Sequence, residues 1–133
     1  MPDRILIAGA GIGGLAAALA LAESGSRVTV FEAHDGLGEM GAGLQLSANA
    51  VKALRLMGLE DAVAARASRP EAVELRLPKS GRLVSRVELG ARHEAKFGAP
   101  YFHIHRADLH GVLAEAAAAH PGIQVVTGAR VVR

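Results

Sequence analysis

The sequence contains no cysteine and no tryptophan, and only 3% of its 133 residues are aromatic. The lack of cysteine excludes disulfide bonds, thiolate catalysis and cysteine-ligated metal sites. It fits a cytoplasmic protein, which is the location we expect. The excess of positive charge is also small: the formal net charge is +2, and no basic run is interleaved with aromatic residues. We therefore expect no nucleic acid among the partners.

Half of the residues are hydrophobic, and glycine occurs 16 times. This composition is typical of a close-packed α/β protein and not of a disordered or fibrous one. The length is enough for one domain, or a piece of one, with a buried core.

The stretch from 5 to 21 carries no charge and has two interpretations. One is a secretory signal, because the stretch is apolar and contains small residues suited to cleavage near its end. Against it, Asp3 cancels the charge of Arg4, and four glycines interrupt the stretch. Glycine-rich sequence is also poor for a membrane span. We expect neither a signal peptide nor contact with a membrane.

The first 32 residues predict a βαβ unit. Residues 4–8 form a short apolar run typical of a buried parallel strand, and residues 14–24 have helical periodicity. Gly25 ends the predicted helix, and residues 27–32 alternate as a second strand.

The turn between the first strand and the helix matches G-x-G-x-x-G at Gly9, Gly11 and Gly14. The first N–H groups of a helix lack intrahelical partners, so a pyrophosphate is stabilised there. In this pattern Gly9 allows the tight turn, Gly11 the approach of phosphate and Gly14 close helix packing. Glu32 lies 18 positions after Gly14, near the spacing of about 20 expected for a ribose-binding carboxylate. We predict a dinucleotide site; the alternative is an ordinary βαβ turn with a solvated Glu32.

The rest of the chain contains further predicted elements. In order, they are a glycine-rich loop at 34–43, a helix capped by Ser47 and running to Met57 before Gly58, a short helix at 60–67, a β-hairpin at 71–89 with its turn at 78–81, an irregular connection at 90–100, an extended segment at 101–105, a helix at 108–119, a strand at 123–127 and the start of another at 129–133.

Two strings beyond the βαβ unit bear on the ligand, because FAD and NAD present the same ADP group to that unit. They are G-A-G-L-Q-L-S-A-N-A at 41–50 and H-R-A-D-L-H at 105–110. With them, the whole chain resembles the single-component FAD-dependent aromatic-ring hydroxylases, which include salicylate and hydroxybenzoate hydroxylases. The resemblance implies an α/β fold: a Rossmann-like FAD-binding domain with a parallel sheet, plus a β-hairpin that belongs to an incomplete substrate-binding sheet.

The resemblance also implies contacts with FAD. They are Gly9, Gly11 and Gly14 at the pyrophosphate, Glu32 at the adenosine ribose, Gly43, Leu44 and Gln45 along the inner end of the flavin, Arg106 near the ribityl and pyrophosphate groups, and Val131 at the adenine through its backbone. Arg106 is also suited to phosphate by its fixed charge, although a surface arginine at a helix start is the alternative. We name no catalytic residue.

Three histidines, His103, His105 and His110, are close together in the sequence. We expect no metal site, because no carboxylate or cysteine pattern completes a recognised ligand set. Contact of His103 or His105 with substrate or flavin remains one interpretation, and an ordinary surface or hydrogen-bonded histidine is the other.

The activity implied by the resemblance is hydroxylation of a small phenolic or aromatic acid, such as salicylate or hydroxybenzoate, with bound FAD, O₂ and NAD(P)H as transient reductant. The alternatives are another FAD-dependent oxidoreductase and a non-catalytic dinucleotide-binding fragment.

Chains of the family are about three times longer, which the resemblance implies. We therefore expect residues 1–133 to be an N-terminal fragment of the FAD-binding domain, inactive by itself, with residues 70–99 coming from the substrate-domain side. The hairpin alone would expose apolar strand faces. We expect the remainder of the polypeptide or a second copy, in a homodimer, to cover it.

Overall fold

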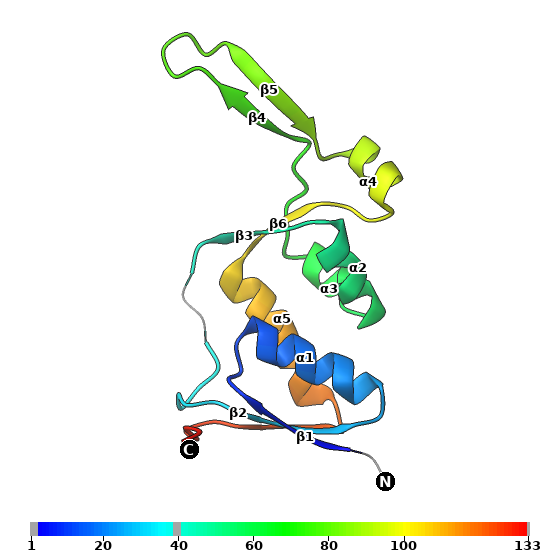
Figure 1. Ribbon diagram of the computed structural model, residues 1–133, viewed down its shortest axis with the longest axis vertical. Helices are drawn as coiled ribbons and strands as arrows, with labels where there is room; N and C mark the ends of the chain where they lie inside the picture. The colour runs from blue at the N-terminus through cyan, green and yellow to red at the C-terminus, as the bar shows by residue number, and fades with distance from the viewer. Residues whose placement is uncertain (1–2, 39–40, 133) are drawn as a thin grey trace. The chain divides into compact units, whose positions relative to one another are not determined.

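The computed structural model describes residues 3–38 and 41–132, whose helices and strands are labelled in Figure 1. The chain forms two compact units. The first consists of Met1–Ala42 and His105–Arg133, and the second of Gly43–Ile104.

The first unit is built on a parallel sheet with the strand order β1-β2-β7. Its strands are β1 (Arg4–Ala8), β2 (Arg27–Phe31) and β7 (Ile123–Val126). The central strand β2 pairs in parallel with both neighbours. The predicted parallel sheet is therefore confirmed, with β7 on the far side of β2 from β1.

Two helices, α1 (Ile12–Glu23) and α5 (Arg106–Ala119), lie on one face of this sheet (Figure 1). They pack on each other and on the strands. The side chains that fill this layer are almost fully buried: Leu15, Ala18, Leu19, Val28, Val30, Val112, Leu113 and Ala117. Leu6 of β1 is 67% exposed.

The second unit contains a pair of short strands, two packed helices, a hairpin and a further helix. The elements are β3 (Gly43–Leu46), α2 (Ala48–Leu56), α3 (Glu60–Ala64), β4 (Ala72–Arg76), β5 (Leu83–Glu88), α4 (Ala91–Phe97) and β6 (Phe102–His105). β3 pairs with β6, and β4 pairs with β5. Val51, Val63 and Phe102 are fully buried and form the centre of this unit.

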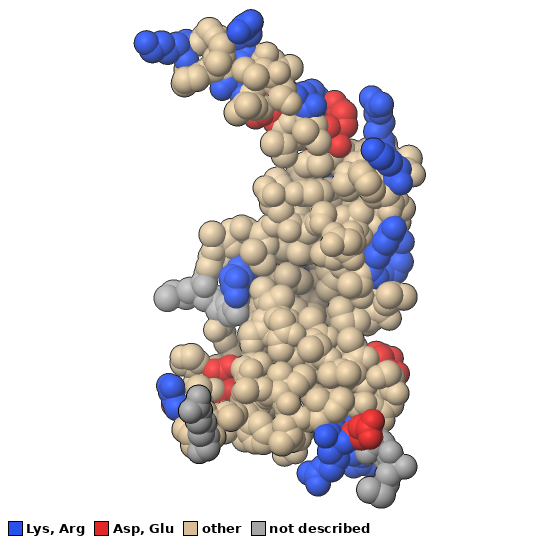
Figure 2. Space-filling view, in the orientation of Figure 1, with Lys and Arg blue, Asp and Glu red and all other residues tan. Residues whose placement is uncertain are grey.

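The antiparallel hairpin β4–β5 is confirmed, with Val73 opposite Val87 and Glu74 opposite Arg86. Its two faces differ in chemistry. One carries ion pairs of Arg86 with Glu74 and Glu88, and acidic and basic side chains are visible on the hairpin in Figure 2. The other carries the apolar pair, and both valines are about half exposed.

Four sequence predictions need correction. The connection predicted as irregular contains α4, which ends at Gly98 with φ +75°. The periodicity gave no sign of this helix because none of its residues is buried. Ser47 occupies the N-cap of α2, but its hydroxyl hydrogen-bonds Asn49 and not the helix backbone. The last turn of the predicted 60–67 helix is absent, since α3 ends at Ala64.

The fourth correction concerns the end of the chain. Residues 129–132 form no strand, although a strand was predicted to begin there. Gly128, the second residue after β7, adopts φ +65° and turns the chain away from the extended path. Arg133 and positions 39–40 of the predicted loop lie outside the described residues. Over the residues that are described, no helix is both long and apolar enough to cross a membrane.

Candidate functional site: a cavity at the glycine turn

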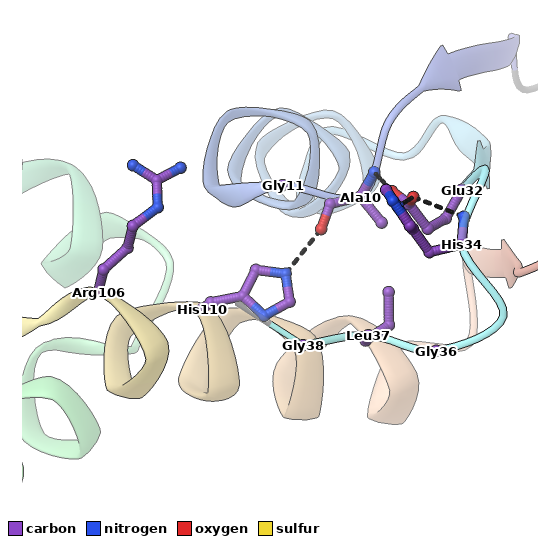
Figure 3. A pocket seen from close by; sticks show the side chains of 9 residues that line it. All are labelled: Ala10, Gly11, Glu32, His34, Gly36, Leu37, Gly38, Arg106 and His110. Atoms are coloured by element: carbon purple, nitrogen blue, oxygen red, sulfur yellow. Dashed lines mark hydrogen bonds and ion pairs between the residues drawn. The ribbon is translucent and has the colours of Figure 1, made fainter. Parts of the chain in front are cut away.

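A cavity of about 510 Å³ opens in the first unit where β1 and β2 end. The loops after the carboxyl ends of parallel strands are the usual place for ligands in open α/β sheets. Side chains and backbone from the glycine turn, the segment after β2 and the start of α5 line it (Figure 3). The lining residues are Ala10, Gly11, Glu32, His34, Gly36, Leu37, Gly38, Arg106 and His110.

The glycine turn has the geometry that the motif predicts. Gly9 adopts φ +99°, and its N–H donates to Phe31 O at 2.7 Å, which ties the turn to the end of β2. A Cβ on Gly14 would lie 2.0 Å from Gly9 O, so only glycine allows α1 to approach the turn this closely. Both positions therefore need glycine for backbone reasons.

The N-terminus of α1 fits an anionic group. Gly11 is the N-cap, with extended backbone and, within the described residues, no side-chain cap. The first helical hydrogen bond runs from Leu15 N to Gly11 O at 2.9 Å, so the N–H groups of residues 12–14 have no acceptor inside the helix. These donors and the positive end of the helix dipole suit a pyrophosphate.

Glu32 follows β2 directly and lies across the turn. Its carboxylate accepts hydrogen bonds from the backbone N–H groups of Ala10 and His34, each at 2.9 Å. The His34 ring adds a contact of 2.7 Å between Nδ1 and Oε1. The His34 N–H, then the Ala10 N–H and the His34 ring, lower the pKa of Glu32 from 4.5 to about 2. The group is therefore an ionised acceptor at neutral pH.

The depressed pKa of Glu32 predicts a pH dependence of stability. The carboxyl group takes up a proton at higher pH in the unfolded chain than in the folded one, so its contribution is fully present above about pH 4.5 and is lost as the pH falls toward 2. The difference in melting temperature between the wild type and Glu32→Gln should therefore shrink over this window. Thermal unfolding of both proteins from pH 6 to pH 2.5 measures it. A difference that stays constant over that range would contradict the assignment.

Arg106 supplies the cation of the cavity. It is the first residue of α5, and its N–H donates to Ala42 O at 3.1 Å. Gly41 packs directly on its side chain, because a Cβ at this position would lie 2.7 Å from Arg106 Cδ and 3.1 Å from Arg106 Cβ. Since Arg106 Cβ is fixed to the helix, a rotamer change alone would not remove the overlap.

We expect Gly41→Ala to displace the Arg106 side chain and to weaken binding of an anionic ligand. The loss should be about fivefold, corresponding to roughly 1 kcal/mol for one weakened charge-assisted hydrogen bond. A double-mutant cycle with Arg106→Ala, read out as ADP affinity by calorimetry, tests the coupling. An undiminished effect of Gly41→Ala in the Arg106→Ala background would show that Gly41 acts by another route.

The remaining predicted site residues lie elsewhere. Gly43, Leu44 and Gln45 belong to β3 of the second unit, where Gln45 Oε1 accepts a hydrogen bond from the Tyr101 hydroxyl at 2.9 Å. Val131 is 58% exposed and is not among the residues that line the cavity. The chain just before it runs beside the cavity, since Ala129 N donates to Glu32 O at 2.8 Å.

The predicted histidine cluster divides into separate roles. His105 accepts a hydrogen bond from Ala107 N at 3.3 Å and caps α5. His110 is buried and contacts Ala10 O. His103 lies in the second unit. Among the described residues, no group of three or more histidine or acidic side chains is arranged to hold a metal ion.

Sequence reasoning did not assign His34 or His110 to the cavity. His34 could have been predicted from sequence, because it lies two residues after Glu32. At that spacing a backbone N–H can donate a hydrogen bond to the carboxylate. The partner of His110 is 100 positions away, and no local pattern reveals such a contact.

The chain belongs to the FAD binding domain family, which matches residues 3–133. It is 46% identical over 110 residues to 3-amino-4-hydroxybenzoate 2-monooxygenase of Streptomyces cremeus, covering 83% of this chain and 28% of the relative. It is 42% identical over 132 residues to 3-hydroxybenzoate 6-hydroxylase 1 of Aquipseudomonas alcaligenes, covering 99% and 34%. The chain thus spans about a third of the length of these curated relatives.

Solved structures show the same fold. Klebsiella pneumoniae HpxO complexed with FAD and uric acid matches with a TM-score of 0.82 and 28% identity, over 98% of this chain and 32% of that one. The tetrameric form of 2-methyl-3-hydroxypyridine-5-carboxylic acid oxygenase matches with a TM-score of 0.84 and 28% identity, over 98% and 33%. The mixed α/β fold with a parallel sheet is therefore shared with these two proteins.

Proposed function

We propose that the cavity at the glycine turn holds the ADP half of FAD. The observation that carries this proposal is the meeting of two complementary features in one cavity. The N-cap Gly11 lines the cavity, so the helix start, whose first N–H groups have no acceptor within the helix, faces it and suits the pyrophosphate, and the ionised Glu32 suits a ribose diol. Membership of the FAD binding domain family supports FAD over NAD as the tightly bound ligand.

Each residue would have a defined task in binding. Gly9 and Gly14 shape the turn, and Gly11 leaves room for phosphate because it has no side chain. Glu32 would accept hydrogen bonds from the ribose hydroxyls in addition to those from the neighbouring backbone, because an ionised carboxylate has about four acceptor sites. Arg106 would add a fixed positive charge near the phosphates.

Other contacts are proposed from the resemblance. Gly43, Leu44 and Gln45 would lie along the inner end of the flavin, and the hydrogen bond from Tyr101 would hold the Gln45 side chain in one orientation. Val131 would offer its backbone to the adenine.

We further propose that the complete protein is a flavin-dependent monooxygenase of a small aromatic acid. The relatives support this class, since their names specify hydroxybenzoates, an aminohydroxybenzoate and 6-hydroxynicotinate. When bound, FAD would supply the redox chemistry, with NAD(P)H as reductant and O₂ as oxidant. The protein would orient the cofactor and exclude water. Salicylate and 3-hydroxybenzoate are the first substrates to test.

The test of this activity uses the full-length protein loaded with FAD. NAD(P)H oxidation should accelerate when an aromatic hydroxy acid is added, and chromatography with mass detection should find a product heavier by one oxygen atom. Flavin reduction and turnover without any oxygenated aromatic product would instead identify another FAD-dependent oxidoreductase.

A further inference from the structure

His110 is the only buried polar or charged side chain within the described residues, with 4% of its surface exposed. It lies on α5 and reaches the glycine turn, where its Nε2 is 2.7 Å from Ala10 O (Figure 3). A carbonyl oxygen only accepts hydrogen bonds, so the ring must carry its proton on Nε2. The side chain therefore acts as a donor to the backbone of the turn.

This hydrogen bond fixes the orientation of the peptide unit between Ala10 and Gly11. The unit is planar and trans, so its N–H points in the direction opposite to its carbonyl. With the carbonyl held by His110, the Gly11 N–H is directed away from α5. A flip of this peptide would point the carbonyl where the Gly11 N–H now points and replace a donor to phosphate with an acceptor, and the hydrogen bond opposes that flip.

The same contact sets the position of α5 relative to the turn. Arg106 and His110 are four residues apart, so they lie on one face of α5 a turn apart, and both line the cavity (Figure 3). Because His110 is hydrogen-bonded to Ala10 O, the first turn of α5, which carries Arg106, is tied to the glycine turn.

We propose that His110 is a positioning residue for the pyrophosphate, acting through the Ala10–Gly11 peptide and through Arg106. This inference rests on the proposed function, namely that the cavity binds the ADP half of FAD. It assigns His110 no contact with the reacting atoms. It makes a specific claim about ligands, since the effect of the residue should appear with phosphate-bearing ligands and not with the nucleoside.

We expect His110→Leu to lower the affinity for ADP and FAD by about tenfold or more, because the buried carbonyl loses its donor and the turn can reorient. Adenosine, which lacks phosphate, should bind the variant as it binds the wild type. In His110→Gln, an amide N–H can donate to the same carbonyl, so this variant should recover much of the lost ADP affinity.

Leu109→Ala is the matched control. Leu109 is buried on the same helix, 3% exposed, and its loss should lower stability without changing the ratio of ADP to adenosine affinity. The four full-length proteins are titrated with ADP by calorimetry and with adenosine by NMR, and their melting temperatures are recorded without ligand. If His110→Leu does not fold, His110→Asn replaces it: its amide is one methylene too short to reach Ala10 O, so it should lose ADP affinity relative to His110→Gln and keep adenosine affinity, and equal ADP affinity of the two amide variants would overturn the role of His110.

The outcomes separate this inference from the proposed function. A wild type that binds no ADP refutes the proposed function, and this inference with it. A wild type that binds ADP, with His110→Leu binding it equally well, overturns only the role of His110. So does a variant that loses ADP and adenosine in equal proportion, because that pattern indicates general loss of structure. A selective loss of ADP binding, restored by glutamine, supports the inference.

Discussion

Gly14→Ala should largely unfold the first unit, whereas Gly13→Ala should leave it intact. A Cβ at position 14 would lie 2.0 Å from Gly9 O and 3.1 Å from Gly9 C. Both are backbone atoms, and Gly9 adopts φ +99°, which leaves its carbonyl little freedom to move. The overlap can be relieved only by moving α1 away from β1. We expect a loss of about 3 kcal/mol or more in the free energy of unfolding, the upper end of the range for overpacking.

The neighbouring Gly13 provides the control. It lies in the same turn of α1, but its Cβ would meet no atom within 4 Å. Alanine there should gain helix propensity of up to about 1 kcal/mol. Urea unfolding of the wild type and both variants, followed by circular dichroism, measures the two effects. Equal stability of the two variants would show that close helix packing is not the reason for glycine at position 14.

Glu32→Ala should weaken FAD binding by roughly 5- to 150-fold, which corresponds to about 1–3 kcal/mol for lost hydrogen bonds to a charged group. The carboxylate stays ionised because its pKa is lowered to about 2, so at neutral pH it is a full acceptor for the ribose hydroxyls. The affected part of the ligand is the ribose, which distinguishes this loss from a general weakening of the site.

The comparison of ADP with 2′-deoxy-ADP tests this role. The wild type should prefer ADP, and Glu32→Ala should bind both with similar affinity. Glu23→Gln serves as the control for charge, because Glu23 lies at the opposite end of α1 from the glycine turn. If Glu32→Ala keeps the preference for ADP, the carboxylate does not hold the ribose.

Much of the first unit could be predicted from sequence because its constraints are local. Gly9 and Gly25 both adopt positive φ, which glycine alone accommodates easily, and their positions fix the ends of β1 and α1. The strand β2 follows from alternation of apolar residues. The acidic residue after it was predicted from spacing alone, and the structure places Glu32 at the glycine turn through its bond to Ala10 N.

The features that escaped prediction depend on contacts distant in sequence or on surface chemistry. His110 meets its partner 100 residues away. The helix α4 has no buried face and therefore no apolar period, so its good helix formers were not recognised. Gly41 gave no local signal either, because the reason for glycine there is the Arg106 side chain, which comes from a distant helix.

The central claim is that the cavity bounded by the glycine turn, Glu32 and Arg106 binds the ADP half of FAD. Quenching of flavin fluorescence during titration of the full-length apoprotein tests it most directly, with ADP and riboflavin as competitors. We predict saturable binding of one FAD, which ADP reverses and riboflavin reverses far less. Binding that riboflavin reverses as well as ADP does, or no binding of FAD, would contradict the account.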